Sequence, residues 1–475
     1  MQEQIDVKDI QGIIIRGYSN FPAAEFLLLS IKDAALSKKW LSSILKNITP
    51  GNVKPDDVAA HIAFTFSGLK ALGLNQNILD SFPIELEDGM TTKHKQFFLG
   101  DFGDSDSANW EWGSDNTTPV HILLMLYAKD SATLASAINA YKKDFDSYNI
   151  QEIQSLGTTV LYERKEHFGF HDGIAQPTIS GLKRKDSGEN CLAAGEFILG
   201  YKNEYGQYTP RPGVPAEADQ SSLLPAMPQT AMHDLGLNGS YLVFRQLKQD
   251  VSLFWKYVAS VTKNMDGSVN EEEMIKLSAQ MVGRWPNGTP VVLSPDKELA
   301  DMGDKDDFGY RDSDPNGFKC PVSSHTRRSN PRDSLDVSKP VSLSISKKHR
   351  LLRRGRSYGP PLTETLKPID CLNAAECDDD RGLHFICVNA DIGRQFEFVQ
   401  NGWINNIKFN GLYEEADPLV SNHHNPQDVK KTGSFCVYNN VVRRRMTDIP
   451  EFIKVKGGAY FFLPGIKALT FLANF

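Results

Sequence analysis

Short apolar runs alternate with amphipathic stretches through the first third of the chain. Apolar and β-branched residues concentrate at 10–15, 25–31, 61–66 and 120–127, which predicts four strands. Helical spacing follows at 34–47, where Asp33 stands in the N-cap position, and at 131–143. This mixture predicts an α+β domain of the ferredoxin-like type over residues 1–160.

The second half repeats this pattern with longer insertions. Residues 178–235 are rich in glycine, proline, serine and charge, so we assign 161–235 as a connecting segment with a long functional loop. Strands are predicted at 240–244 and 383–388, and helices at 251–263, 271–282 and 392–403. We therefore expect a second ferredoxin-like domain over residues 236–475, with antiparallel sheets and peripheral helices in both domains.

Composition narrows the classes of protein that this pattern allows. The 475 residues are 40% hydrophobic and 23% charged, which is ordinary for a globular protein, and the net charge is −7. That balance disfavours a general attraction to nucleic acid or anionic membrane. No apolar run is long enough to span a bilayer, no secretory signal is visible at the first residues, and the six cysteines form no CxxC pair. We expect a cytoplasmic protein with neither a membrane nor a nucleic acid as partner.

The segment 167–173 is the first candidate site. His167 and His171 stand four residues apart, which on a helix would suit zinc, but Gly169 and the Asp172-Gly173 pair argue against a helix. Asp172 lies between an aromatic residue and a glycine, so it could serve acid–base chemistry in a partly desolvated place. A simple turn-capping role for Asp172 stays open from this segment alone.

A lone histidine among arginines is the second candidate. His325 is followed by Arg327, Arg328 and Arg332, a combination that suits an iron porphyrin: imidazole ligates iron and guanidinium pairs with propionate. A solvated surface loop is the plainer interpretation. The basic run at 347–356 leaves nucleic-acid binding as a further alternative, although the rigid turn after it suggests that at least one arginine is held in position.

Together and in order, these segments resemble the dye-decolorising peroxidase family of haem enzymes. The strongest match is the GxxDG motif and its flanks at 168–177. Supporting segments lie at 9–12, 195–206, 238–245, 325–332, 353–359 and 382–385. The insertions at 181–235 and 301–320 resemble the longer-loop members.

The resemblance implies two ferredoxin-like domains and one haem b per chain, held mainly by the C-terminal domain. It implies that His325 is the proximal iron ligand, Asp172 the distal carboxylate and Arg353, rather than Arg354, the distal arginine. Arg332 is the candidate for a haem propionate. Further cofactor contacts are expected at Gly173, Ile174 and His171. Asp391 is the candidate acceptor for the other ring nitrogen of His325, a bond that would raise ligand basicity.

The function implied is a haem peroxidase. It would reduce hydrogen peroxide and oxidise organic donors such as dyes and phenolics in one-electron steps through a ferryl intermediate. The alternative is a haem carrier or sensor with incidental peroxidase activity, which would need His325 but neither Asp172 nor Arg353. The sequence leaves a homo-oligomer open.

Overall fold

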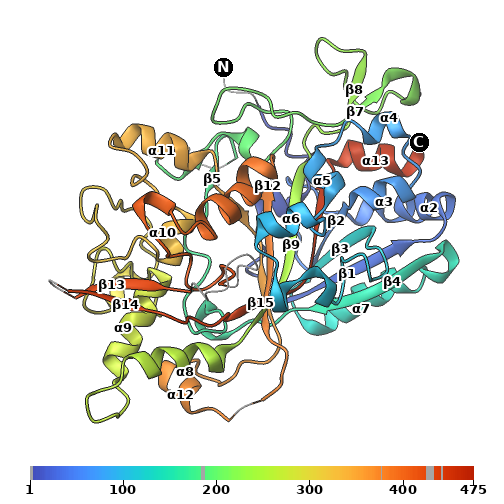
Figure 1. The fold of residues 1–475 in the computed structure, drawn as a ribbon. Coiled ribbons are helices and arrows are strands. Elements are labelled where there is room, and N and C mark those ends of the chain that lie inside the picture. Colours follow the sequence, from blue (N-terminus) through green and yellow to red (C-terminus); the bar gives the residue numbers. More distant parts are fainter. Residues whose placement is uncertain (1–3, 183–187, 376, 424–432, 440–441) are drawn as a thin grey trace.

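The computed structural model describes residues 4–182, 188–375, 377–423, 433–439 and 442–475. The N-terminal half contributes four antiparallel strands, β1 (Ala23–Ile31), β2 (Val58–Phe64), β3 (Ile122–Ala128) and β4 (Ile150–Gly157), in the order β4-β1-β3-β2. Helices α2 (Ala34–Ile44) and α7 (Ser131–Lys142) follow β1 and β3 (Figure 1). Asp33 caps α2 by accepting a hydrogen bond from the Leu36 N–H at 2.8 Å, as its sequence position predicts.

The C-terminal half repeats the strand order of the first. Its strands are β9 (Ser240–Gln249), β10 (Leu352–Arg353), β11 (Arg356–Tyr358), β12 (Gly382–Asn389) and β15 (Ile453–Leu463), in the order β10-β12-β9-β15, with β11 also paired to β12. All of these pairings are antiparallel. If β10 and β11, which both pair with β12, are counted as one interrupted strand, each half places its first strand between its third and its fourth.

The remaining elements surround these strands (Figure 1). The other helices are α1 (Gly12–Ile15), α3 (Phe66–Ala71), α4 (Gln76–Leu79), α5 (Ile84–Asp88), α6 (Lys93–Leu99), α8 (Val251–Val261), α9 (Glu271–Val282), α10 (His325–Ser329), α11 (Lys339–Lys347), α12 (Pro368–Asn373) and α13 (Ile466–Asn474). Three small sheets pair β5 (Thr178–Ile179) with β6 (Cys191–Leu192), β7 (Gly213–Pro215) with β8 (Met232–Asp234), and β13 (Phe435–Asn439) with β14 (Val442–Met446).

One nine-stranded sheet runs through both halves, because β2 and β15 meet at its middle. Phe462 of β15 lies opposite Phe64 of β2. Gln11 bridges the two strands: its amide N–H donates to the carbonyls of Ile62 (2.8 Å) and Pro464 (3.0 Å), and its oxygen accepts from the Ile62 N–H (2.9 Å). Just after β4, the Thr159 N–H donates to the Ser357 carbonyl at 2.8 Å, so the sheet curls toward closure.

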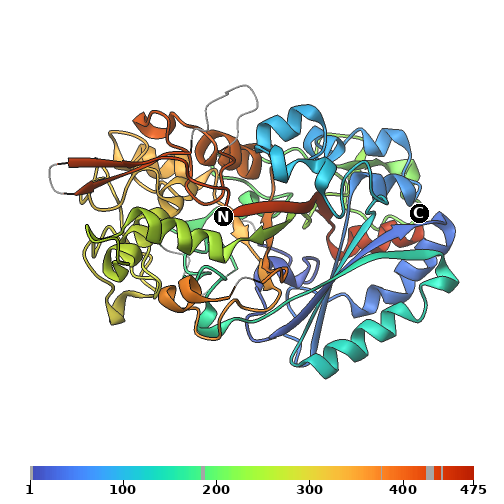
Figure 2. The same ribbon diagram turned by 60° about the horizontal axis from the view of Figure 1, so that its bottom comes forward.

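Successive side chains of each strand point to opposite faces of the sheet, so the apolar side chains pack into two separate cores. Phe26 and Leu28 of β1 point to the inside of the curled sheet, where they meet Phe244 of β9. Leu27 and Leu29 point the other way and pack beneath the helices. Figure 2 shows helices covering the outer face of the N-terminal half at the right of the molecule.

The α+β class with antiparallel sheets is confirmed, and most predicted elements are found within a few residues of their predicted limits. The strand predicted at 10–15 is wrong, because this segment forms the single helical turn α1. Its apolar run reflects full burial of Ile13 and Ile14 rather than strand pairing. The helix predicted at 392–403 consists of two π-helical pieces, Gly393–Glu397 and Val399–Ile404. The boundaries proposed at residues 160 and 235 stay a prediction. Within the described ranges, no helix combines the length and apolarity needed to cross a bilayer.

Candidate active site

A cavity of about 300 Å³ lies against the outer face of the C-terminal half of the sheet. Leu247 of β9 and Leu383 and Phe385 of β12 line it from the sheet, and the π-helical segment contributes Phe396 and Val399. The loop that precedes β5, helix α10 and strand β10 supply its chemically active side chains. The cavity therefore brings together segments that are far apart in the sequence.

The loop at 165–173 carries one side of the site. Gly169 has φ +95°, and a Cβ there would lie 2.5 Å from the Leu366 carbonyl, so only glycine fits. The Glu166 carboxylate accepts hydrogen bonds from the N–H groups of Phe168 and Phe170, each at 3.0 Å, and from the Gln249 amide at 2.7 Å. Because the segment is a loop and not a helix, the geometry needed for the zinc alternative is absent from it.

The two histidines of this loop make different contacts. His167 is fully buried, and its Nε2 lies 2.8 Å from the Tyr358 carbonyl; burial lowers its pKa to about 4. His171 lines the cavity, with its Nε2 4.0 Å from the Asp304 carboxylate. No cluster of metal-ligating side chains is found in the part of the chain that the structure describes.

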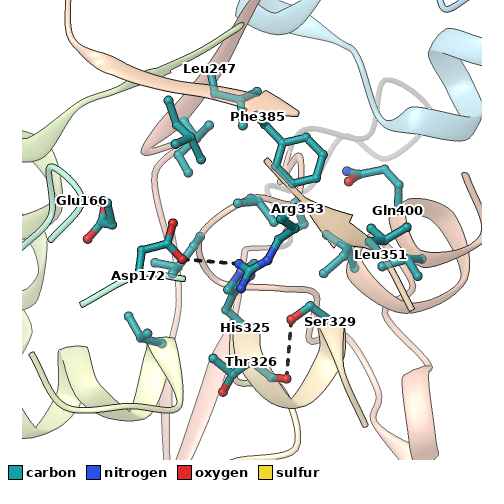
Figure 3. Close-up of a pocket in the computed structure, with 18 of the residues that line it drawn as sticks. Glu166, Asp172, Leu247, His325, Thr326, Ser329, Leu351, Arg353, Phe385 and Gln400 are labelled. Atoms are coloured by element: carbon teal, nitrogen blue, oxygen red, sulfur yellow. Dashed lines mark hydrogen bonds and ion pairs between the residues drawn. The ribbon is translucent and has the colours of Figure 1, made fainter. Parts of the chain in front are cut away.

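Asp172 and Arg353 meet across the cavity. An oxygen of the Asp172 carboxylate lies 3.4 Å from an Nη atom of Arg353 (Figure 3). The same oxygen accepts a hydrogen bond from the Gly173 N–H at 2.6 Å. Both side chains are partly exposed to the cavity, 44% for Asp172 and 34% for Arg353. Gly173 and Ile174 line the cavity beside them.

The neighbouring arginines of the basic run point in a different direction. Arg354 donates to the carbonyls of Ile13 (2.6 Å) and Ile14 (2.7 Å), and Arg356 binds the carbonyls of Gly17 and Tyr18. Because successive side chains of a strand alternate between its faces, Arg353 reaches the cavity and Arg354 does not. Of these three arginines, Arg353 lines the cavity, whereas Arg354 and Arg356 bind backbone carbonyls. They therefore do not form a free basic surface.

His325 is the first residue of α10 and faces the same cavity (Figure 3). Its Nδ1 lies 2.8 Å from the Asp417 carboxylate, which is fully buried and also accepts from the N–H groups of Leu419 and Val420. Burial alone would lower the pKa of His325, but the charge and hydrogen bond of Asp417 outweigh it and raise that pKa. No hydrogen bond among the described residues uses Nε2, so this nitrogen is available to a ligand.

The expectation that Asp391 holds His325 is wrong. Asp391 accepts hydrogen bonds from the backbone N–H (2.9 Å) and side-chain Nε (3.4 Å) of Arg394, and it does not line the cavity. Asp417 takes the expected position instead. It lies 92 residues beyond His325 in the sequence, and no local pattern marks it.

Arginines form the edge of the cavity beyond α10. Arg332 lines it, but its guanidinium is already bound to the Asp306 carboxylate and to the Asp306 and Phe308 carbonyls. Arg350 also lines it, and one of its Nη atoms is buried with no hydrogen-bond partner among the described residues. Burial lowers the pKa of Arg350 to about 10. Arg350 is thus better placed than Arg332 to receive an additional anionic group.

These residues fit a haem. The imidazole of His325 presents a free nitrogen and has its other nitrogen fixed by a carboxylate, which is the usual arrangement of an iron-ligating histidine. The walls are largely apolar, as a porphyrin ring requires. The unpartnered guanidinium nitrogen of Arg350 suits a propionate carboxylate. Asp417, Arg350 and Glu166 are cavity or supporting residues that sequence reasoning missed.

Comparisons with known proteins agree with this combination of fold and site. The family model for the DyP dimeric alpha+beta barrel domain matches residues 9–160. The dye-decolorizing peroxidase msp1 of Mycetinis scorodonius is 28% identical over 98% of this chain and 87% of its own length. The dye-decolorizing peroxidase AauDyP1 of Auricularia auricula-judae is 28% identical over 98% of this chain and 86% of its own.

Solved structures agree as well. A crystal structure of the peroxidase from Auricularia auricula-judae superposes with a TM-score of 0.78 at 27% identity, covering 99% of this chain and all of that one. This agreement over the whole chain identifies a peroxidase, an oxidoreductase. Over almost its full length the chain is similar to dye-decolorising (DyP-type) peroxidases, and residues 9–160 match a domain model of that family.

Proposed function

We propose that this protein binds one haem b and uses it to reduce hydrogen peroxide while oxidising organic donors, dyes and phenolics among them, in one-electron steps. The observation that carries the proposal is the placement of Asp172 and Arg353, 3.4 Å apart, in the same cavity as a histidine fixed by a buried carboxylate. Similarity to dye-decolorising peroxidases supports the haem and the class of reaction.

The C-terminal half of the chain would hold most of the cofactor. His325 would ligate the iron through Nε2, with Asp417 holding the ring and raising its basicity. Arg350 and Arg332 would lie near the propionates. His171, Gly173 and Ile174 would contact the cofactor from the distal loop, since all three line the cavity.

The distal pair can perform the acid–base work. When bound, haem supplies a redox-active iron at which peroxide is reduced. The Asp172 carboxylate would take a proton from peroxide and return it to the oxygen that departs as water. The Arg353 guanidinium would stabilise the negative charge on that oxygen as the O–O bond breaks. Glu166 would hold the Asp172 loop against β9 through the bonds described above.

Hydrogen peroxide and an organic electron donor are the partners that this proposal requires. The sheet needs no second copy of the chain, because β2 and β15 of one chain already join its two halves. A homo-oligomer and a cytoplasmic location stay predictions.

Rapid mixing with peroxide tests the proposal. The haem-loaded protein is expected to react within seconds, and Asp172→Asn and Arg353→Leu are each expected to slow this reaction about 100- to 1000-fold with haem still bound. Arg445→Leu, on the exposed β14, serves as the matched control and should react like the parent protein. His325→Ala should weaken haem uptake, seen as a reduced Soret band.

The outcomes separate the peroxidase from the haem carrier. If the Asp172 and Arg353 variants both keep full peroxide reactivity, the roles given to them are wrong. If haem binds through His325 but the parent protein turns over no faster than free haem, the carrier is the correct function.

A further inference from the structure

Glu166 and Asp172 lie on one face of a short two-stranded ribbon. The Glu166 N–H donates to the Phe170 carbonyl at 2.9 Å, and the Asp172 N–H donates to the Arg164 carbonyl at 3.1 Å, so the two chain segments run antiparallel. Because side chains alternate along each strand, Glu166 and Asp172 point to the same face. They are diagonal neighbours, roughly 7–8 Å apart in a pairing of this kind. Both line the cavity.

Asp172 stands between Glu166 and the distal arginine. In Figure 3, Asp172 is drawn with Glu166 on one side and Arg353 on the other. The Asp172 carboxylate is paired with the Arg353 guanidinium at 3.4 Å, whereas the Glu166 carboxylate accepts only from neutral N–H groups. Among the described residues no ion pair includes Glu166. A negative charge on Glu166 is therefore opposed by Asp172 and has no cation of its own.

Glu166 changes its charge near neutral pH. Burial makes its ionisation unfavourable and raises its pKa to about 7. The three hydrogen bonds to its carboxylate act against this rise, whereas the negative charge of Asp172 adds to it. The Cys371 thiol on α12, which is close enough to feel Glu166, stays neutral because its own burial raises its pKa. Lys165 pairs with Glu163 at 3.6 Å instead. Glu166 is thus neutral below about pH 7 and ionised above it.

Gln249 of β9 can form a hydrogen bond with either charge state of Glu166. Its Nε2 donates to Glu166 Oε2 at 2.7 Å, whereas its Oε1 is buried and has no hydrogen-bond partner among the described residues. A half-turn of this amide brings Oε1 to the carboxyl group, where it accepts from a protonated Glu166. The loop can therefore keep its bond to β9 when Glu166 takes up a proton.

The charge of Glu166 matters because the proton that Asp172 moves stays within one peroxide molecule. In the proposed reaction Asp172 takes a proton from one peroxide oxygen and gives it to the other. Its own affinity for the proton therefore cancels over the whole transfer, and the negative charge on the departing oxygen remains to be stabilised. A second carboxylate beside Asp172 repels that charge and opposes Arg353, whereas a neutral carboxyl group does not.

We propose that Glu166 is a positioning residue of the distal pair: in its neutral form it leaves Asp172 without a second negative charge beside it, and in its ionised form it slows the reduction of peroxide. This inference rests on the proposed peroxidase function for its effect on the rate, but not for the coupling between the two carboxyl groups.

Infrared difference spectra of the haem-loaded protein without peroxide measure the coupling, because a protonated carboxyl group has a C=O stretch that a carboxylate lacks. The band that is missing from Glu166→Gln should disappear around pH 7 in the parent protein. In Asp172→Asn, which removes the opposing charge, it should disappear about 0.5–1 pH unit lower. Glu163→Gln, on an exposed part of the same loop, should leave it in place. Glu451, whose pKa burial also raises to about 7, contributes equally to each spectrum and cancels in the difference.

Rapid mixing with peroxide over a range of pH measures the effect on the reaction. The rate of the parent protein should fall about 3- to 10-fold between about pH 6 and about pH 8.5, as Glu166 loses its proton. Glu166→Gln should lose this fall, whatever its rate at pH 6. Glu163→Gln should keep the fall of the parent protein. The ratio of the two rates within one variant separates an effect of charge from a general weakening of the loop.

Two results would overturn the proposal. One is a Glu166 band that titrates at the same pH in Asp172→Asn as in the parent protein, and the other is an alkaline fall in Glu166→Gln as large as that of the parent. If Glu166→Gln does not fold, the difference between the parent protein and Asp172→Asn still shows whether a carboxyl group loses its proton at lower pH, and decides alone. A parent protein that does not react with peroxide counts against the peroxidase function, whereas the infrared result counts only for or against the coupling.

Discussion

The two halves of the sheet share one strand order but use their outer faces in opposite ways. In the N-terminal half, Leu27 and Leu29 of β1 and Leu124 of β3 are fully buried beneath helices. In the C-terminal half, the corresponding face of β9 and β12 carries Leu247 and Phe385, which line the cavity. Helix α8, which follows the first strand as α2 does, packs instead against α9, α12 and Phe452 in a separate core.

This difference shows how one arrangement of strands yields a core in one place and a site in another. Where the helix lies on the sheet, the outer face is apolar and closed. Where helix α8 is displaced from the sheet, loops and short helices surround the outer face and leave a cavity. Polar residues such as Arg245 and Gln249 then stand at positions of β9 that face this cavity. Catalytic and binding residues are commonly carried by loops that a rigid scaffold of strands and helices holds in position.

Truncation of one outer-face leucine in each half should show the difference between the two faces most strongly. Leu124→Ala is expected to lower the free energy of unfolding by about 2–5 kcal/mol, because it opens a void in a closed core. Leu247→Ala should cost no more than about 1 kcal/mol in the cofactor-free protein, because its side chain already borders the cavity. Urea unfolding measures both. Equal losses would mean that the two faces are packed alike.

Replacing Asp417 tests whether the carboxylate behind His325 supports haem binding in the C-terminal half. Asp417→Asn should weaken haem binding about 10- to 100-fold, because the ring loses its charged partner. Asp391→Asn is the matched control, since Asp391 binds Arg394 outside the cavity, and it should leave the affinity unchanged. Titration of the Soret band measures both variants. Equal weakening in the two would contradict the assignment of Asp417.

Replacing Glu166 is expected to have a smaller effect, on the pH dependence of the free energy of unfolding. Burial raises its pKa to about 7, so the folded chain holds this proton more tightly than the unfolded chain does. The group therefore contributes stability below about pH 4.5 that is lost as the pH rises through 7. Glu166→Gln should reduce the difference in unfolding free energy between pH 5 and pH 8 by on the order of 1 kcal/mol, since part of the carboxylate borders the cavity.

Urea unfolding of the cofactor-free protein at the two pH values checks this expectation. Glu217→Gln, on an exposed carboxylate, should keep the pH dependence of the parent protein. The same dependence in Glu166→Gln would show that Glu166 does not titrate in this range.

The sequence predicts the strands and long helices well, because their apolar periodicity and caps are local. Helix α9 is found with the predicted limits Glu271–Val282, and β1 and α7 agree closely. Motif resemblance locates Asp172, His325 and Arg353, which all line one cavity. The partner of His325 is missed because Asp417 is brought to it only by the path of the loop after the π-helical segment. Burial likewise makes the run at 10–15 look like a strand, although it forms a helical turn.

The junction between β2 and β15 has a consequence for how the chain is made. Strand β2 ends at Phe64, but its partner on that side is Ile453–Leu463, close to the C-terminus. During synthesis, the N-terminal half can pair β4, β1, β3 and β2 as soon as Gly157 has emerged, yet the free edge of β2 must wait until β15 has been made. An unpaired edge invites association with other chains. The interval between the emergence of β2 and that of β15 should therefore be the period of greatest vulnerability to aggregation, and truncation before β15 should yield an insoluble product.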